Sequence, residues 1–147
     1  MWDAVSRALA LGPADSPIDA VLPVPLHPRK LRHRGFNQAL ELARVALAHL
    51  RDRSPRPALL PTLERHLLLR TRNTRELARE LGRSGPGARR AEVFGAFAVS
   101  DPARVAGRRF LVVDDVMTTG ATLNECAETL IQAGAAEVRV VALARAV

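Results

Sequence analysis

The stretch FLVVDDVMTTGAT, residues 110–122, decides the fold of this chain. Its first four residues form an uninterrupted apolar run, which is typical of a strand buried on both faces of a parallel sheet. In residues 123–131 the apolar side chains recur at helical spacing, and Gly134 follows where a glycine commonly ends a helix. A second apolar run at 138–143 predicts another strand. Strand, turn, helix and strand in this order predict an α/β fold with a parallel sheet.

The turn between strand and helix combines two chemical features. Asp114 and Asp115 are adjacent carboxylates at the carboxyl end of the strand, where α/β sheets bind their ligands. Residues 118–122 then place three threonines and a glycine at the first turn of the helix, where free N–H groups and the helix dipole attract anions. Because carboxylates repel phosphate, we expect the acids to hold a neutral group beside it, such as a ribose diol. The turn therefore predicts a site for a ribose 5-phosphate, without the lysine of a P-loop.

The rest of the chain carries shorter patterns. Asn37 is a predicted N-cap, because apolar residues keep helical spacing from there to residue 50. Residues 25–35 contain two prolines among basic and histidine side chains, so we expect no regular element there. Glycines, a proline and arginines between residues 82 and 95 indicate a long loop. The remaining predicted elements are strands at 20–24 and 67–70 and helices at 2–11 and 74–81.

Composition limits the class of protein. A chain of 147 residues with 48% hydrophobic and 25% charged residues has the composition of one globular domain. No apolar run approaches the roughly 18–20 residues of a membrane span, and the opening residues lack the basic start of a secretory signal. We therefore expect a cytoplasmic protein without a membrane partner. The single Cys126 excludes an internal disulfide, and its place on the apolar stripe of the helix predicts a small core residue.

The basic residues are concentrated in one part of the chain. The net charge is +7, and the excess of positive charge lies within residues 1–100. Arg29, Lys30, Arg32 and Arg34 form the densest cluster, which favours an anionic ligand or a nucleic acid. The alternatives are a GC-rich coding sequence for the arginine content and a solvated loop for the cluster. No aromatic residue interleaves with the cluster, which disfavours recognition by stacking on bases.

Two groups of motifs resemble a known family. VVDDVMTTGAT at 112–122 resembles the phosphoribosyl pyrophosphate (PRPP) motif of type I phosphoribosyltransferases. VPLHP at 24–28, RGFNQ at 34–38 and AAEVRVVALAR at 135–145 resemble the ComF/GntX family of competence-associated phosphoribosyltransferase-like proteins. The resemblance implies a three-layer, parallel-sheet type I phosphoribosyltransferase fold.

The resemblance also implies a division of the chain and a role for each matching residue. Residues 1–17 are expected to be an N-terminal helix and lead-in, and residues 18–147 the phosphoribosyltransferase-like domain with a mobile lid loop at about 74–95. Mg²⁺ is implied as an ion carried by PRPP, with no metal site on the protein itself. The implied contacts are Asp114 and Asp115 to the ribose hydroxyls, Thr118, Thr119, Gly120, Ala121 and Thr122 to the 5-phosphate, Arg29, Lys30 and Arg34 to the pyrophosphate, and Arg72 and Thr74 in the lid.

The sequence departs from the family pattern in two places. Many members begin with a cysteine-rich zinc-binding segment, and with Cys126 alone that part is absent from this sequence. Either the protein is a short variant or the sequence lacks an amino-terminal piece. In the lid, Leu77 stands where members carry Gln and Glu92 near the position of an Asn. One hypothesis is a phosphoribosyltransferase acting on an unidentified base or amine acceptor, and the alternative is a non-catalytic PRPP- or nucleotide-sensing module in DNA uptake or regulation. Possible further partners are a protein of the competence machinery, DNA, and a second copy in a homo-oligomer.

Overall fold

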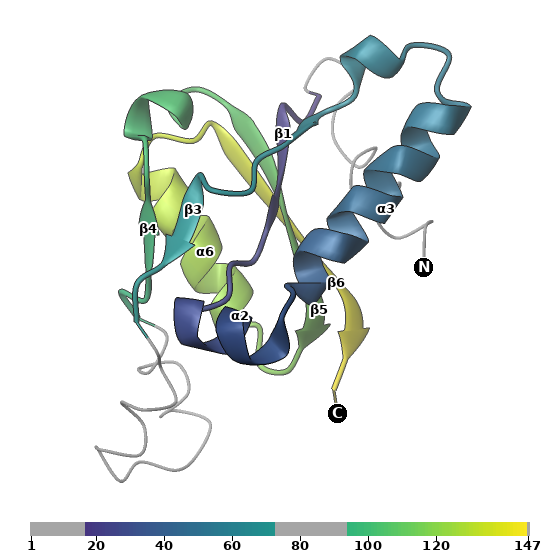
Figure 1. Cartoon of the computed structure of the whole chain (residues 1–147). Coiled ribbons are helices and arrows are strands. Elements are labelled where there is room, and N and C mark those ends of the chain that lie inside the picture. Colours follow the sequence, from purple (N-terminus) through teal and green to yellow (C-terminus); the bar gives the residue numbers. More distant parts are fainter. Residues whose placement is uncertain (1–16, 73–93, 147) are drawn as a thin grey trace, which may run out of the picture.

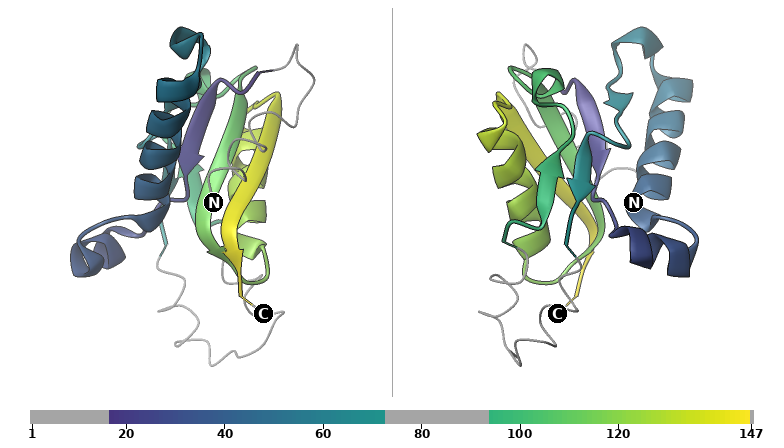
Figure 2. Two further views of the ribbon diagram at one scale, coloured as in Figure 1. Left: turned by 90° about the vertical axis from the view of Figure 1, so that its right-hand side faces the viewer. Right: turned by 60° about the vertical axis from the view of Figure 1, so that its left-hand side comes forward.

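A computed structural model describes residues 17–72 and 94–146 of the chain. A four-stranded parallel sheet forms the middle layer, in the strand order β2-β1-β5-β6 (Figure 1). The helix α3 lies on one side of this sheet, and the helix α6 lies on the other together with an antiparallel hairpin of β3 and β4 (Figure 2). This is the three-layer α/β architecture that the sequence predicts.

The elements have the following bounds. The sheet strands are β1 (Ala20–Pro23), β2 (Thr62–Leu63), β5 (Arg109–Met117) and β6 (Glu137–Arg145). The helices are α2 (Pro28–Arg34), α3 (Gln38–Arg53) and α6 (Ala121–Gln132). The hairpin strands are β3 (Leu68–Arg70) and β4 (Phe97–Val99), and two short 3-10 helices are η1 (Pro57–Leu59) and η2 (Pro102–Arg104).

β5 is the central strand, and its side chains divide the core into two halves. Phe110 and Val112 pack on the face that α6 and the hairpin cover, whereas Leu111 and Val113 pack against α3. All four are fully buried, which explains why the sequence shows an unbroken apolar run rather than alternation. The strand continues past the predicted residues 110–113 to Met117 because β6 pairs with it along its whole length.

α3 begins where the sequence predicts. The Asn37 side chain accepts a hydrogen bond from the N–H of Leu40 at 3.4 Å and donates one to the carbonyl oxygen of Val24 at 3.0 Å. It therefore caps the helix and fixes its start beside the end of β1. The buried face of α3 consists of Ala39, Ala43, Ala46 and Leu47. Three alanines on this face let the helix backbone approach the sheet closely.

α2 contradicts the expectation that residues 25–35 hold no regular element. Pro28 is the first residue of this helix, where the missing N–H of proline costs no hydrogen bond and its fixed φ favours the helix. His27 precedes it as the N-cap, and Gly35, with a φ of 80°, ends it. The prediction was wrong because it treated Pro28 as a helix breaker, although proline is favoured at a helix start. No residue of α2 is buried, so tertiary packing contributes little to this helix.

The other sequence predictions have mixed outcomes. The predicted strands at 20–24, 67–70 and 138–143 and the helix at 123–131 are confirmed within a few residues. The predicted helices at 2–11 and 74–81 lie outside the described residues, as does most of the predicted loop and lid. Within residues 17–72 and 94–146, no helix is long and apolar enough to cross a membrane.

Candidate functional site

The candidate site lies where β1 and β5 end. The N–H of Val24 donates to the carbonyl oxygen of Val113 at 2.9 Å, so β1 leaves the sheet directly beside Asp114. Asp114 itself still pairs with Ala142 of β6, which places the acid within the strand rather than in the following loop. Asp114 therefore lies just beyond the end of β1 and near the carboxyl ends of β5 and β6, toward the edge where such sheets bind ligands.

The turn after β5 has the geometry of an anion site. Gly120 adopts a φ of 77° and forms the N-cap of α6, without any side-chain cap. The Thr119 hydroxyl accepts a hydrogen bond from the N–H of Ala121 at 3.3 Å, which tightens the turn. The first N–H groups of a helix have no carbonyl partner within it and carry the positive end of its dipole. With the exposed Thr118 and Thr119 hydroxyls beside them, these groups present donors to an anion.

The conformation of Gly120, and not lack of space, explains the glycine. A Cβ added here would meet the Met117 Sδ at 3.5 Å, which is ordinary van der Waals contact. The positive φ, however, is one that residues with a Cβ adopt at a cost. A glycine is therefore required by the backbone of the turn.

The structure brings Asp114 together with all five residues predicted to bind the 5-phosphate. A small hollow of about 30 Å³ is lined by Asp114, by Val116, Met117 and Leu123, and by Thr118, Thr119, Gly120, Ala121 and Thr122. We call these five residues the phosphate loop. Asp115 does not line the hollow. Its carboxylate accepts a hydrogen bond from the N–H of Val116 at 2.9 Å.

The two acids are coupled to each other. The Asp114 carboxylate accepts a hydrogen bond from the N–H of Asp115 at 2.9 Å. Burial, and next the neighbouring Asp115, raise the pKa of Asp114 from its ordinary 3.8 to about 6, against the positive charge of Arg70. Raised carboxylate pKa values at a strand end are common in functional sites, because the fold places charge there at a cost.

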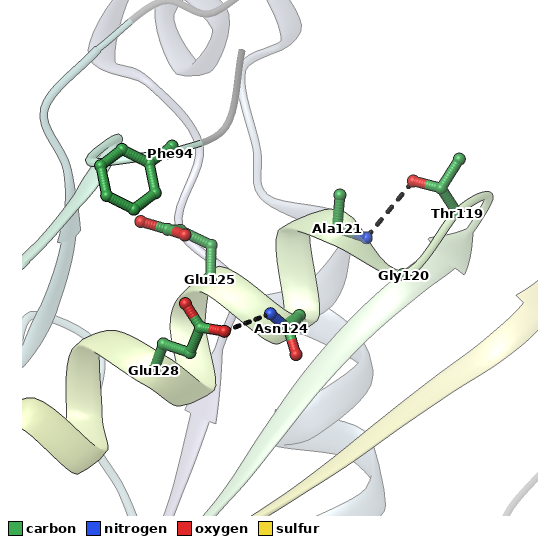
Figure 3. A pocket seen from close by; sticks show the side chains of 7 residues that line it. All are labelled: Phe94, Thr119, Gly120, Ala121, Asn124, Glu125 and Glu128. Carbon is green, nitrogen blue, oxygen red and sulfur yellow. Dashed lines mark hydrogen bonds between the residues drawn. The ribbon is translucent and has the colours of Figure 1, made fainter. Parts of the chain in front are cut away.

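A larger pocket adjoins the phosphate loop on the outer side of α6 (Figure 3). It has a volume of about 670 Å³ and shares Thr119, Gly120 and Ala121 with the loop. Its other lining residues are Phe94, Asn124, Glu125 and Glu128. The Glu125 carboxylate accepts from the N–H of Gly95 at 2.6 Å, and the Asn124 amide donates to Glu128 at 2.7 Å. The sequence analysis did not predict these four residues as part of a site, because their pattern is that of the polar face of a helix and the end of a loop.

The predicted pyrophosphate-binding residues lie on α2, at the same end of the sheet as the phosphate loop (Figure 1). Arg29 and Arg34 are exposed, and Lys30 is half-buried. The Arg34 guanidinium donates to the Gln38 side chain at 2.6 Å, toward the start of α3. None of the three lines either hollow at the phosphate loop. The structure therefore brings Asp114 and the phosphate loop together in one hollow, which neither Asp115 nor the three cations of α2 line.

The other predicted residues have varied positions. Arg72 is exposed just after β3, whereas Thr74, Leu77 and Glu92 lie outside the described residues. Cys126 is fully buried in the core, as predicted, and burial raises the pKa of its thiol. Its inaccessibility is that of a structural residue.

One further charged residue, Arg70, was missed in the sequence. Its guanidinium lies over the Phe97 ring, 5.3 Å from the ring centre. A signal was present, because Arg70 follows the buried Leu68 by two residues and so belongs to the core-facing row of β3.

The chain is similar to known proteins over most of its length. The chain is 34% identical over 133 residues to DNA utilization protein YhgH of Escherichia coli O6:H1, covering 86% of this chain and 49% of that protein. It is 34% identical over 129 residues to Competence protein F of Haemophilus influenzae, covering 87% of this chain and 51% of that protein. The chain thus spans about half the length of the curated relatives it matches. These relatives bear out the resemblance to the ComF/GntX group.

Among solved structures, the chain is similar to a glutamine PRPP amidotransferase from B. subtilis complexed with ADP and GMP, with a TM-score of 0.49 and 21% identity. That match covers 96% of this chain and 25% of the other. The model of the phosphoribosyl transferase domain matches residues 40–146, which include α3, the phosphate loop and β6. The chain therefore belongs to the phosphoribosyl transferase domain family.

Proposed function

We propose that this protein binds PRPP at the end of β5 and transfers its phosphoribosyl group to a nitrogenous acceptor. The observation that carries the proposal is the single hollow that Asp114 shares with the whole phosphate loop. A carboxylate accepts hydrogen bonds from hydroxyls, whereas backbone N–H groups at a helix start donate to phosphate. A ribose 5-phosphate offers both kinds of partner at one short separation.

The proposed reaction joins the acceptor to the sugar. A nitrogen of the acceptor forms a bond to the anomeric carbon while the bond from that carbon to the pyrophosphate oxygen breaks, and pyrophosphate leaves with the electron pair. The sugar develops positive charge on this path, which the carboxylates of Asp114 and Asp115 stabilise. Arg29, Lys30 and Arg34 on α2 are proposed to attract the pyrophosphate. Arg72 and Thr74 are proposed to contact the ligand from the lid.

Mg²⁺ is proposed to arrive with PRPP. Within the described residues, no three His, Cys, Asp or Glu side chains are grouped as a metal cage would require. Such a site suits a hydrated Mg²⁺ held mainly by phosphate oxygens of the ligand. When bound, the ion neutralises charge on the pyrophosphate.

The biological setting follows from the relatives. Their names refer to competence and to DNA utilization, and we propose that this chain, too, serves DNA uptake in the cytoplasm. One observation favours a second function, a module that senses PRPP or a nucleotide and contacts DNA or a protein partner. α2 carries Arg29, Lys30, Arg32 and Arg34 on a helix of which no residue is buried, so a large polyanion has access to it.

Two measurements test the proposal. Calorimetric titration of the protein with Mg²⁺-PRPP, ribose 5-phosphate and inorganic pyrophosphate is expected to show saturable binding of PRPP, tightest of the three because it fills every subsite. Release of pyrophosphate from PRPP is then followed with a panel of purines, pyrimidines and amines. Turnover with one of them supports the enzyme, and binding without any turnover supports the sensing module. No binding of either PRPP or ribose 5-phosphate would refute the enzyme and a module that senses PRPP.

A further inference from the structure

Arg70 occupies a position on the hairpin that normally belongs to an apolar residue. Side chains two residues apart on a strand point to the same face, so Arg70 continues the row of Leu68. Leu68 is buried in the core cluster that also contains Leu123 and Cys126 of α6. Leu69, between Leu68 and Arg70, is 40% exposed. The core-facing row of β3 therefore ends in a cation that faces α6 and the end of β5.

Packing on β4 holds the Arg70 side chain in this place. Arg70 and Phe97 are directly paired across the hairpin, and the guanidinium lies 5.3 Å from the centre of the Phe97 ring. The Nε atom of Arg70 is fully buried. Two hydrogen bonds from Thr71 to the carbonyl oxygen of Ala96, at 2.8 and 3.2 Å, fix the backbone just beyond. Stacking on the ring leaves the charge fixed in direction, as a flexible surface arginine is not.

Asp114 continues the row of Phe110 and Val112 on β5, which packs in the same core cluster as Leu68, so its side chain lies on the same side of the sheet as Arg70. The positive charge lowers the pKa of Asp114 against the larger effect of burial, and it also lowers the pKa of Cys126. Within residues 17–72 and 94–146, the titratable groups around Asp114 are Asp115 on β5, Arg70 on β3 and Cys126 on α6. Ala142 of β6 lies opposite Asp114. Among these groups, Arg70 carries the positive charge that works against the desolvation of Asp114 and the negative charge of Asp115.

We propose that Arg70 is a positioning residue that favours the ionised form of the Asp114 carboxylate, so that the site accepts a ribose diol near neutral pH. This inference rests on the proposed function for the identity of the ligand. Arg70 of the hairpin would thus affect ligand binding through Asp114 on β5, without contacting the ligand itself.

The first test needs no ligand. The carboxyl carbon of Asp114 is assigned in ¹³C NMR spectra by its disappearance in Asp114→Asn and then titrated with pH. We expect Arg70→Met to raise the pKa of Asp114, because a positive charge is lost, and Arg70→Lys, which keeps the charge, to restore most of the parent value. Arg65→Met removes an exposed arginine before β3 and serves as the matched control. An unchanged pKa of Asp114 in Arg70→Met overturns the inference. If Arg70→Met does not fold, Arg70→Gln, which keeps most of the side-chain volume, is titrated in its place with the same two outcomes.

The second test uses Mg²⁺-PRPP. If the pKa rises by one unit from about 6, Arg70→Met should bind PRPP roughly threefold more weakly than the parent at pH 6.5 and almost equally at pH 9, where Asp114 is ionised in both. A loss of the same size at both pH values indicates direct contact of Arg70 with the ligand and contradicts the positioning role. If the parent binds no PRPP, the proposed function fails, whereas the ¹³C titration still decides the role of Arg70.

Discussion

The phosphate loop and α2 lie at the same end of the sheet, yet they are built in opposite ways. The phosphate loop joins a strand with four fully buried residues to a helix with three buried residues, Leu123, Cys126 and Leu130, and offers mainly backbone N–H groups. α2 has no buried residue and offers charged side chains from a helix of seven residues. The loop is thus fixed by the core behind it, whereas α2 is held mainly by its two ends.

The two regions differ in how their donor groups would bind an anion. Backbone donors at a helix start are already oriented when the ligand arrives, because packing of β5 and α6 orients them. Long cationic side chains lose rotamer freedom on binding, and their attraction is screened by salt. We therefore expect the phosphate loop and its acids to determine which ligand binds, and α2 to add affinity that depends on ionic strength.

The largest expected effect is that of removing both acids. Asp114→Asn combined with Asp115→Asn should weaken binding of Mg²⁺-PRPP by about 100-fold, or about 3 kcal/mol, because two charged acceptors for the ribose hydroxyls are lost. Calorimetry measures the change. Inorganic phosphate, which needs only the loop, should bind as well as before or better, since two negative charges are gone.

This double variant has a control on α3. Asp52→Asn removes an exposed acid in the last turn of that helix and should leave PRPP binding unchanged. If the double variant loses phosphate and PRPP to the same degree, the acids support the loop structure and do not hold the ribose.

A smaller effect is expected on α2. Arg29→Ala with Lys30→Ala should weaken pyrophosphate binding by roughly tenfold at low salt and ribose 5-phosphate by much less, because only pyrophosphate reaches these cations in the proposed pose. The fold should stay intact, since no α2 residue is buried. Arg51→Ala with Arg53→Ala, at the far end of α3, removes the same charge as a control. An equal loss for both ligands would argue against a pyrophosphate role.

Sequence reasoning succeeded for the phosphate loop because each local pattern there agrees with the fold. The run of residues 110–113, the glycine at 120 and the apolar stripe of α6 all follow from burial and backbone geometry, which leave a direct trace in sequence. For α2 the sequence pattern was ambiguous, because proline is found both where helices end and where they begin. Arg70 left a signal in the sequence, its place two residues after Leu68, whereas the residues around Phe94 could not be found, because their place depends on which elements pack together.

The two ends of α6 allow the loop backbone to be tested separately from helix stability. Gly120 and Gly134 flank the helix with φ values of 77° and 98°. An alanine Cβ would find its nearest neighbour at 3.5 Å at either site, so each substitution costs about 1 kcal/mol in backbone strain rather than a clash. Urea unfolding should therefore show similar losses for Gly120→Ala and Gly134→Ala.

Only one of this pair is expected to affect the ligand. Gly120→Ala should weaken ribose 5-phosphate binding several-fold because it tilts the first N–H groups of α6, whereas Gly134→Ala should leave it unchanged. Equal affinities in the two variants would mean that the phosphate is not held at the start of α6.

The smallest expected effect is a gain in stability. The folded protein holds the pKa of Asp114 at about 6 instead of the ordinary 3.8, so between these values the folded state binds more protons than the unfolded chain. Its stability therefore falls as pH rises through this window, and the cost is fully present above it. A shift of this size corresponds to about 3 kcal/mol at most, and partial exposure of Asp114 to water reduces it to about 1 kcal/mol.

Asp114→Asn removes this cost, because an amide does not ionise and its oxygen still accepts from the N–H of Asp115. Urea unfolding should find the variant about 1 kcal/mol more stable than the parent at pH 7.5 and equal to it near pH 3.5, where Asp114 is protonated in both states. A more stable variant that binds PRPP more weakly would show that Asp114 serves ligand binding and lowers the stability of the fold. A loss of stability at pH 7.5 would instead make Asp114 a structural acid, and the contrast between the phosphate loop and α2 would then rest on packing alone.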